Sequence, residues 1–206
     1  MKKNIHIIIG LILIFIGLVI SVFGLINTGI NFNPNSFKGQ ITMTHDFEFV
    51  ELNSIIYEGH VGDIEVIRTN TEFIKVKTKR NPSAKLDLKT IDGVLYIKQD
   101  EISLVGNNEC EIIIEMPKDK TIDLSVSINL GEVEIKNSNI KNINISINVG
   151  EVDIDNVNFT NLYVFVSVGD IDINTGDTKD NYTINGEGSG SKIINANTNL
   201  GELNIN

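Results

Sequence analysis

The blocks NLGEVEIKN (129–137), NVGEVDIDN (148–156) and SVGDIDINT (167–175) follow one another at a constant step of 19 residues. Looser copies occur earlier and later in the chain, as HVGDIEVIR (60–68) and NLGELNIN (199–206). A unit of this length cannot bury its apolar face alone, so repeats of this kind are typical of chains that stack equivalent coils on one another. The repeat therefore predicts an architecture before it predicts any chemistry.

Each copy alternates apolar and polar residues on both sides of its glycine. Alternation of period two in β-branched residues predicts two half-buried strands per copy, with the glycine at the turn between them. The apolar positions before the glycine are expected to point inward, and they end at Leu130, Val149 and Val168. No window between 41 and 206 sustains a helical period, so almost no helix is expected there.

The fold class predicted from this pattern is all-β: a single-stranded β-solenoid, similar to a right-handed parallel β-helix, with about 19 residues per coil. We expect residues 121–175 to form regular coils, with irregular first coils at 41–120 and irregular last coils at 176–206. Stacking would place Asn129 beside Asn148, and Asn137 beside Asn156, where side-chain amides can pair along the stack. Ordinary turn propensity explains asparagine at these places equally well.

The N-terminal segment reads as a membrane anchor. Residues 5–26 are an apolar run of 22 positions, long enough at ~1.5 Å per residue to cross a ~30 Å hydrocarbon core. Lys2 and Lys3 precede the run, which predicts that residues 1–4 lie in the cytoplasm and that the rest of the chain lies outside. A cleaved signal peptide is the alternative, but its apolar region is usually shorter and ends at a small-residue site. Residues 27–40 are rich in Asn and Gly and read as a spacer.

Small residues within the predicted span fall on one helical face, at Gly10, Gly17, Ser21 and Gly24. Such a strip allows a second helix to approach closely. Glycine is also common in membrane helices in general, so a packing face and a plain membrane helix both fit this spacing.

The charge balance of the remaining chain excludes some classes of function. Every acidic residue lies beyond position 45, so without Lys2 and Lys3 the exposed part carries 15 basic against 27 acidic groups. That balance gives no signature of nucleic-acid binding. Cys110 is the only cysteine, so the domain has no internal disulfide and depends on core burial and backbone pairing.

The segment IIIEMPKDKTIDLSVSINLGEVEIKN (112–137) carries a more specific pattern: an alternating strand, a proline, a short polar stretch, and then Leu-x-Val-x-x-x-x-Gly-(Asp/Glu)-Val-x-Ile. From about Phe47 to Asn206 the chain resembles the bacterial family of adhesin-like domains of unknown function that is related to toast-rack domains, and DGVLYIK (92–98) fits the same resemblance. The resemblance implies an extracytoplasmic β-solenoid that is often tethered to a membrane. It supplies no catalytic or binding residues.

Outward positions after each glycine carry carboxylates. Since Val133 and Ile135 point inward, their polar neighbours point outward, and stacking would align two acidic columns made of Glu132, Glu134, Glu151, Asp153, Asp170 and Asp172. One hypothesis is that Ca²⁺ binds between carboxylates of neighbouring coils, since it prefers oxygen ligands. The other, which we favour, is a solvated acidic face that resists association between sheet edges, with no cofactor.

A basic patch interrupts the acidic chain between 68 and 98, at Arg68, Lys75, Lys77, Lys79 and Arg80 among others. The three lysines alternate along one predicted strand face. The patch either binds an anionic wall polymer or lipid headgroups, or is a solvated strand guarded by lysines.

No residues assemble into a catalytic or zinc-binding motif, since His45 and His60 have no serine or cysteine motif around them and Cys110 stands alone. We therefore expect a non-enzymatic interaction module of a bacterial cell envelope, which would work as an adhesin, scaffold or sensor with an unidentified envelope protein as partner. The alternative is binding of an anionic wall polymer or polysaccharide through the basic patch. A polysaccharide-active enzyme is the third hypothesis.

Overall fold

The computed structural model describes residues 43–49, 51–80, 84–99, 110–177 and 179–206. The predicted membrane segment, with Gly10, Gly17, Ser21 and Gly24, lies outside these residues. The described part of the chain is all-β except for one short 3₁₀ helix, η2 (Lys179–Asn181). It holds no helix long and apolar enough to span a bilayer.

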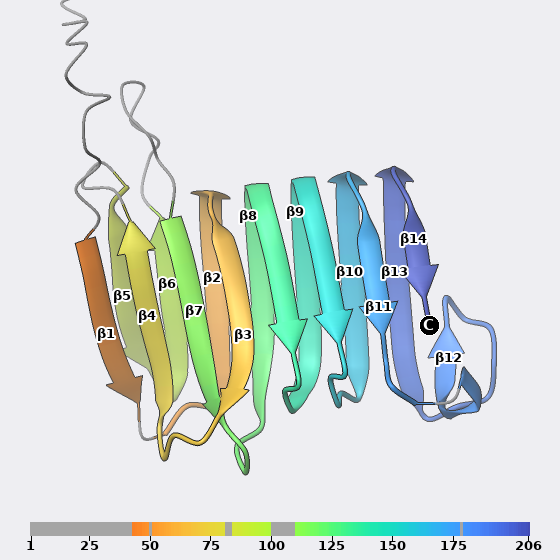
Figure 1. The fold of residues 1–206 in the computed structure, drawn as a ribbon, viewed down its shortest axis with the longest axis horizontal. Helices are drawn as coiled ribbons and strands as arrows, with labels where there is room; N and C mark the ends of the chain where they lie inside the picture. The colour runs from red at the N-terminus through yellow and green to blue at the C-terminus, as the bar shows by residue number, and fades with distance from the viewer. Residues whose placement is uncertain (1–42, 50, 81–83, 100–109, 178) are drawn as a thin grey trace, which may run out of the picture. The chain divides into compact units, whose positions relative to one another are not determined.

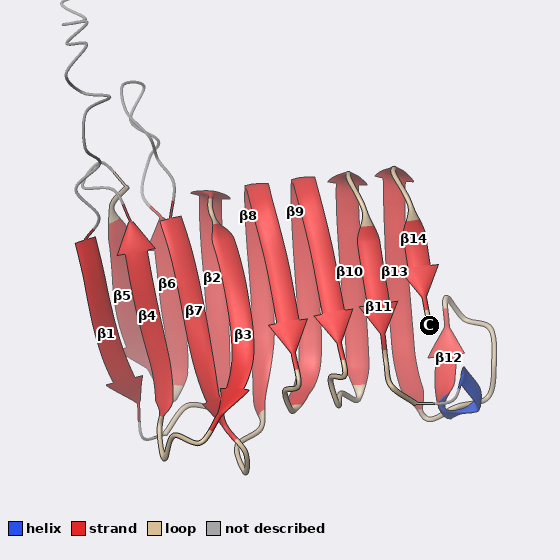
Figure 2. Cartoon of the chain, viewed as in Figure 1, coloured by secondary structure: helices blue, strands red, loops and turns tan. Residues whose placement is uncertain are grey.

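Two layers of strands face each other across one core (Figure 1, Figure 2). The chain passes between the layers within single long strands, because β8 (Ile122–Lys136) and β9 (Ile140–Asp155) each contribute their first half to the back layer and their second half to the front layer. The strand pairs β2 (Ser54–Val61) with β3 (Asp63–Thr69), β10 (Asn161–Val168) with β11 (Ile171–Asn174), and β13 (Lys192–Leu200) with β14 (Leu203–Ile205) do the same with a break at the glycine.

Equivalent coils stack in parallel and in register. Gly131 of β8 lies opposite Gly150 of β9, and the strand positions on either side of these glycines pair at the same step of 19 residues. The φ of Gly150 is +151°, and a Cβ there would lie far inside van der Waals contact with the carbonyl oxygen of Gly131. The repeated glycine is therefore required by the close approach of successive coils as well as by the bend.

The core consists of like residues from successive coils. Leu124, Ile143, Leu162 and Ile194 form one such row, and each is at most 2 % exposed. Burying an aliphatic side chain of this size contributes about 1.5–3 kcal/mol, so a stack of such rows stabilises the domain without a disulfide. Cys110 is also buried, and burial raises the pKa of its thiol to about 11.

The expected inward position of Leu130, Val149 and Val168 is wrong. These side chains are 50 %, 45 % and 42 % exposed. The alternation changes phase at each glycine, since even positions of β8 are buried before Gly131 and odd positions after it. The residue just before the glycine therefore lies at the corner between the layers, outside the core.

Residues before 120 differ from the expected irregular coils. Only β2 and β3 form a coil of the stack. The other early strands widen the two layers: β1 (Met43–Phe49), β4 (Ile74–Arg80) and β7 (Cys110–Pro117) in front, and β5 (Leu86–Ile91) and β6 (Val94–Gln99) at the back. The pairs β1 with β4, β4 with β7, and β5 with β6 are antiparallel. Alternating sequence patterns suit parallel and antiparallel pairing equally, so periodicity alone could not distinguish them.

The break in the repeat after Gly169 is an insertion. Residues 176–191 contain η2 and the short strand β12 (Tyr182–Ile184), which pairs with β13 at the end of the back layer. The stacking then resumes, so that β13 pairs with β10, and β14 pairs with β11.

Candidate functional site

The outer side of the front layer is a continuous acidic surface. Register places Glu132 opposite Glu151, Glu134 opposite Asp153, and Asp153 opposite Asp172, so the predicted columns do align. They are longer than the three regular coils, because the looser copies add to both ends. We call this surface the acidic face; it comprises Asp63, Glu65, Glu132, Glu134, Glu151, Asp153, Asp155, Asp170, Asp172 and Glu202.

Several of these carboxylates accept hydrogen bonds from the next coil. Asp63 Oδ1 accepts the backbone N–H of Glu132 at 3.0 Å, and Asp170 Oδ1 accepts that of Glu202 at 2.7 Å. Lys136 forms an ion pair with Glu134 on the same strand. These contacts hold part of the columns in place and leave the outer oxygens toward solvent.

Crowding of like charges changes the protonation of the acidic face. The pKa of Glu132 is raised, first by partial desolvation and then by the carboxylates of Asp63 and Glu151. The pKa of Asp153 is also raised by desolvation, against the opposing effect of Lys136. In the described residues, no three or more His, Cys, Asp or Glu side chains are grouped so that they could hold a metal ion. Calcium binding between coils stays a hypothesis.

The lysines of the predicted basic patch already face carboxylates. On β4, Lys77 forms an ion pair with Glu115 of β7. Lys79 lies 3.0 Å from Glu111 of β7, and Lys75 lies 3.9 Å from Glu48 of β1. Antiparallel pairing thus places this row of lysines between two strands that carry acidic residues, which neutralises much of its charge.

The two arginines of the patch do not extend the lysine row. Arg68 follows Ile64 and Val66 in the alternation of β3, and it lines a polar groove at the lower end of the stack. Arg80 donates from Nη1 to the carbonyl oxygen of Ala84. The structure therefore brings together only the three lysines, and binding of an anionic polymer through them stays a prediction.

The back layer presents a surface of different chemistry, which sequence analysis missed. Outward positions of β8, β9, β10 and β13 carry serine, asparagine and two exposed aromatic residues, and Asp123 is the one charged group among residues 123–129, 142–148, 161–167 and 193–199. We call this surface the neutral face; it comprises Ser125, Ser127, Asn129, Asn142, Asn144, Ser146, Asn148, Asn161, Tyr163, Phe165, Ser167, Asn195, Asn197 and Asn199. The signal was available, because these residues alternate with the buried ones.

Comparison with known proteins assigns the fold. The family model described as Toastrack DUF4097 matches residues 52–206, which is most of the chain. The chain belongs to this toastrack family.

Solved structures agree with the assignment at the level of the fold. A candidate cell adhesion protein from Clostridium sporogenes ATCC 15579 is similar, with a TM-score of 0.54 and 16% sequence identity, over 80% of this chain and 98% of that one. A candidate adhesin from Bacteroides fragilis NCTC 9343 has a TM-score of 0.38 and 14% identity, over 82% and 98% of the two chains. No curated protein matches this chain.

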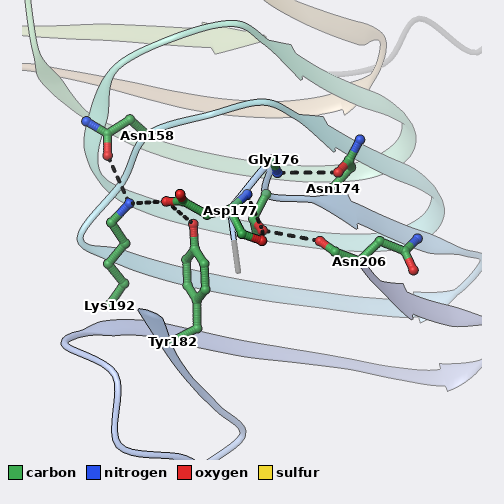
Figure 3. Close-up of polar contacts among 8 residues, drawn as sticks. Asn158, Asn174, Gly176, Asp177, Tyr182, Lys192 and Asn206 are labelled. Carbon is green, nitrogen blue, oxygen red and sulfur yellow. Dashed lines mark hydrogen bonds and ion pairs between the residues drawn. The ribbon is translucent and has the colours of Figure 1, made fainter. Parts of the chain in front are cut away.

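A polar groove of about 300 Å³ lies at the lower end of the toastrack stack, where the insertion folds back (Figure 3). Lys192 Nζ lies 3.2 Å from Asn158 Oδ1 and 3.2 Å from Asp177 Oδ2, and the hydroxyl of Tyr182 donates to the same Asp177 oxygen at 3.4 Å. Lys192 Nζ also lies 5.3 Å from the centre of the Tyr182 ring. These groups satisfy one another, so their evident role is to fasten the insertion to the stack.

Proposed function

We propose that this protein is a single-pass membrane protein of a bacterial envelope, whose toastrack domain works outside the cell as a non-enzymatic interaction module. Residues 5–26 would be the anchor, and residues 1–4 would lie in the cytoplasm. The partner would be an envelope protein with a basic surface, held against the acidic face.

One observation carries the proposal. The carboxylates of the acidic face recur at every coil, although packing requires only the apolar residues between them. Like charges in neighbouring strands are unfavourable, and here they raise the pKa of Glu132 and Asp153. A feature that costs stability and recurs along the whole stack is best explained by use at its surface. A long negative surface suits steering and orientation of a positive partner.

A charge-matched comparison tests the partner. The full-length chain with Glu132→Gln, Glu151→Gln and Asp170→Asn would be crosslinked in membranes and purified beside the unaltered chain. The control carries the same loss of charge at exposed positions elsewhere, as Glu72→Gln, Asp87→Asn and Asp119→Asn. We expect a specific protein to be recovered with the control and lost with the acidic-face variant, and its recovery to fall with salt. Equal recovery with both variants would reject the acidic face as the contact.

Topology has an independent test. Asp119 lies in an exposed turn, whereas Cys110 is buried, so a cysteine introduced as Asp119→Cys would be the reactive thiol of the described domain. A membrane-impermeant maleimide should label it on intact cells. Labelling that appears only after cell lysis would contradict the outward orientation.

A further inference from the structure

The neutral face contains an aromatic site that the acidic-face proposal does not use. Tyr163 and Phe165 are neighbours on the outer side of β10 and are 44 % and 38 % exposed. Two residues along a strand separate their Cα atoms by about 7 Å, so the two side chains stand side by side on a nearly flat sheet. Exposed aromatic pairs on the surface of a domain are a recurrent sign of binding.

Polar side chains border each ring on both neighbouring strands. Tyr163 pairs with Asn144 of β9 and with Asn195 of β13, and Phe165 pairs with Ser146 and Asn197 in the same way. A shallow hollow of about 240 Å³ lies here, lined by Tyr163, Phe165, Asn185, Asn195 and Asn197 among others. Asn185 uses both atoms of its amide on the backbone of Ala196, at 3.0 and 3.1 Å, which fixes one wall of the hollow.

The amides beside the rings differ from the other asparagines of the stack. Elsewhere the amides bond from coil to coil, as Asn148 does to Asn129 and Asn161 does to Asn142. Within the described part of the chain, the side chains of Asn144, Asn195 and Asn197 make no such bond. Each therefore offers two donor hydrogens and an acceptor oxygen to a molecule that lies on the rings.

We propose that Tyr163 and Phe165, with Asn144, Asn195 and Asn197, form a binding site for a neutral carbohydrate chain. A sugar ring has an apolar C–H face, which stacks on an aromatic ring, and a rim of hydroxyl groups, each of which both donates and accepts. The unpaired amides match that rim, because they also do both. The charge of the face fits the same ligand: a nucleic acid or anionic polymer requires cations, whereas a neutral sugar requires none.

Binding of neutral hexasaccharides tests the proposal. Maltohexaose, cellohexaose, chitohexaose and a mannose hexasaccharide would be titrated into the full-length chain by calorimetry, in a polyoxyethylene detergent that contains no sugar, with polygalacturonate as the anionic comparison. We expect at least one neutral sugar to bind, with little dependence on salt. Tyr163→Ala with Phe165→Ala should weaken that binding about tenfold or more, Asn195→Ala with Asn197→Ala should also weaken it, and Tyr163→Phe should retain most of it.

Tyr96 provides the matched control. It is 40 % exposed on the same back layer, but it pairs with Lys89 and lies outside the neutral face. Tyr96→Ala should leave sugar binding unchanged, and circular dichroism should show that all variants fold. The proposal is overturned if none of the four neutral sugars binds, if Tyr96→Ala weakens binding as much as loss of Tyr163 and Phe165, or if that loss instead converts a dimer to a monomer. None of these outcomes bears on the acidic face, whose variants keep both aromatic residues.

Discussion

Asn156 donates a hydrogen bond of 2.7 Å from its side-chain amide to the side-chain oxygen of Asn137, the residue in the same place one coil earlier. Both residues also adopt left-handed backbone conformations, with φ of 51° and 50°. Asparagine therefore does two things at this bend: it pairs along the stack and it tolerates a conformation that most residues avoid. The expected pairing of these amides is confirmed, and so is that of Asn148 with Asn129.

Two substitutions at Asn156 should separate these two contributions. Asn156→Gly removes the amide but allows the left-handed conformation, so it should cost about 0.5–1 kcal/mol of unfolding free energy. Asn156→Ala removes the amide and also strains the backbone, which should cost about 1 kcal/mol more. Urea unfolding of both variants measures the difference. Equal stability of the two would show that the left-handed conformation contributes nothing.

Gly150 should tolerate no side chain. Its Cβ would meet the carbonyl oxygen of Gly131, which is part of the backbone of the neighbouring coil and cannot rotate away. We expect Gly150→Ala to cost about 3 kcal/mol or more, or to prevent folding. Gly186 is the control: its φ is +84°, but nothing lies within 4 Å of a Cβ there, so Gly186→Ala should cost only about 1 kcal/mol. Thermal unfolding of both variants would show the contrast.

The repeat allowed some features to be predicted from sequence and hid others. Val133 and Ile135 were expected inside, and both are fully buried, because alternation and stacking point to the same face. Leu130 was expected inside by the same rule but lies at the corner, because a positive φ at Gly131 reverses the alternation. Alternation within a strand carries no information about such a reversal.

The candidate sites show a second limit. The acidic columns follow from a step of 19 residues, so they could be predicted and were. Tyr163 and Phe165 could also have been placed outside, because they alternate with Leu162, Val164 and Val166. Their neighbours Asn195 and Asn197 could not be assigned, since 32 residues separate the paired positions across the insertion. Pairing of Lys77 with Glu115 was hidden for the same reason, because an antiparallel contact follows no repeat.

The ion pair between Lys77 and Glu115 should support the front layer. Glu115 is 13 % exposed, so a second carboxylate opposite it could not move fully into water. Lys77→Glu should lower stability by about 1–3 kcal/mol, and adding Glu115→Lys should recover part of the loss. Lys79→Glu, opposite the more exposed Glu111, should cost less. If adding Glu115→Lys brings no recovery, the pair is not what stabilises these strands. Because of this coupling, lysine-to-glutamine variants are the better test of polymer binding.

Protonation should relieve the acidic face. A carboxyl group with a raised pKa in the folded state binds a proton at a pH where the unfolded chain has already released it. The free energy of unfolding therefore decreases as the pH rises from the ordinary values, 4.5 for Glu132 and 3.8 for Asp153, through the raised values of the folded protein. The penalty is absent below this window and complete above it.

The double variant Glu132→Gln with Asp153→Asn removes both groups, so its melting temperature at pH 7 should exceed that of the unaltered chain. The difference between the two proteins should shrink as the pH falls toward 4, because the unaltered carboxyl groups then become neutral as well. Comparing the two chains cancels the opposite effect of ion-paired carboxylates such as Glu115, which lose their partners' attraction on protonation. A gap in melting temperature that stays constant from pH 7 to pH 4 would show that the raised pKa values are not the cause.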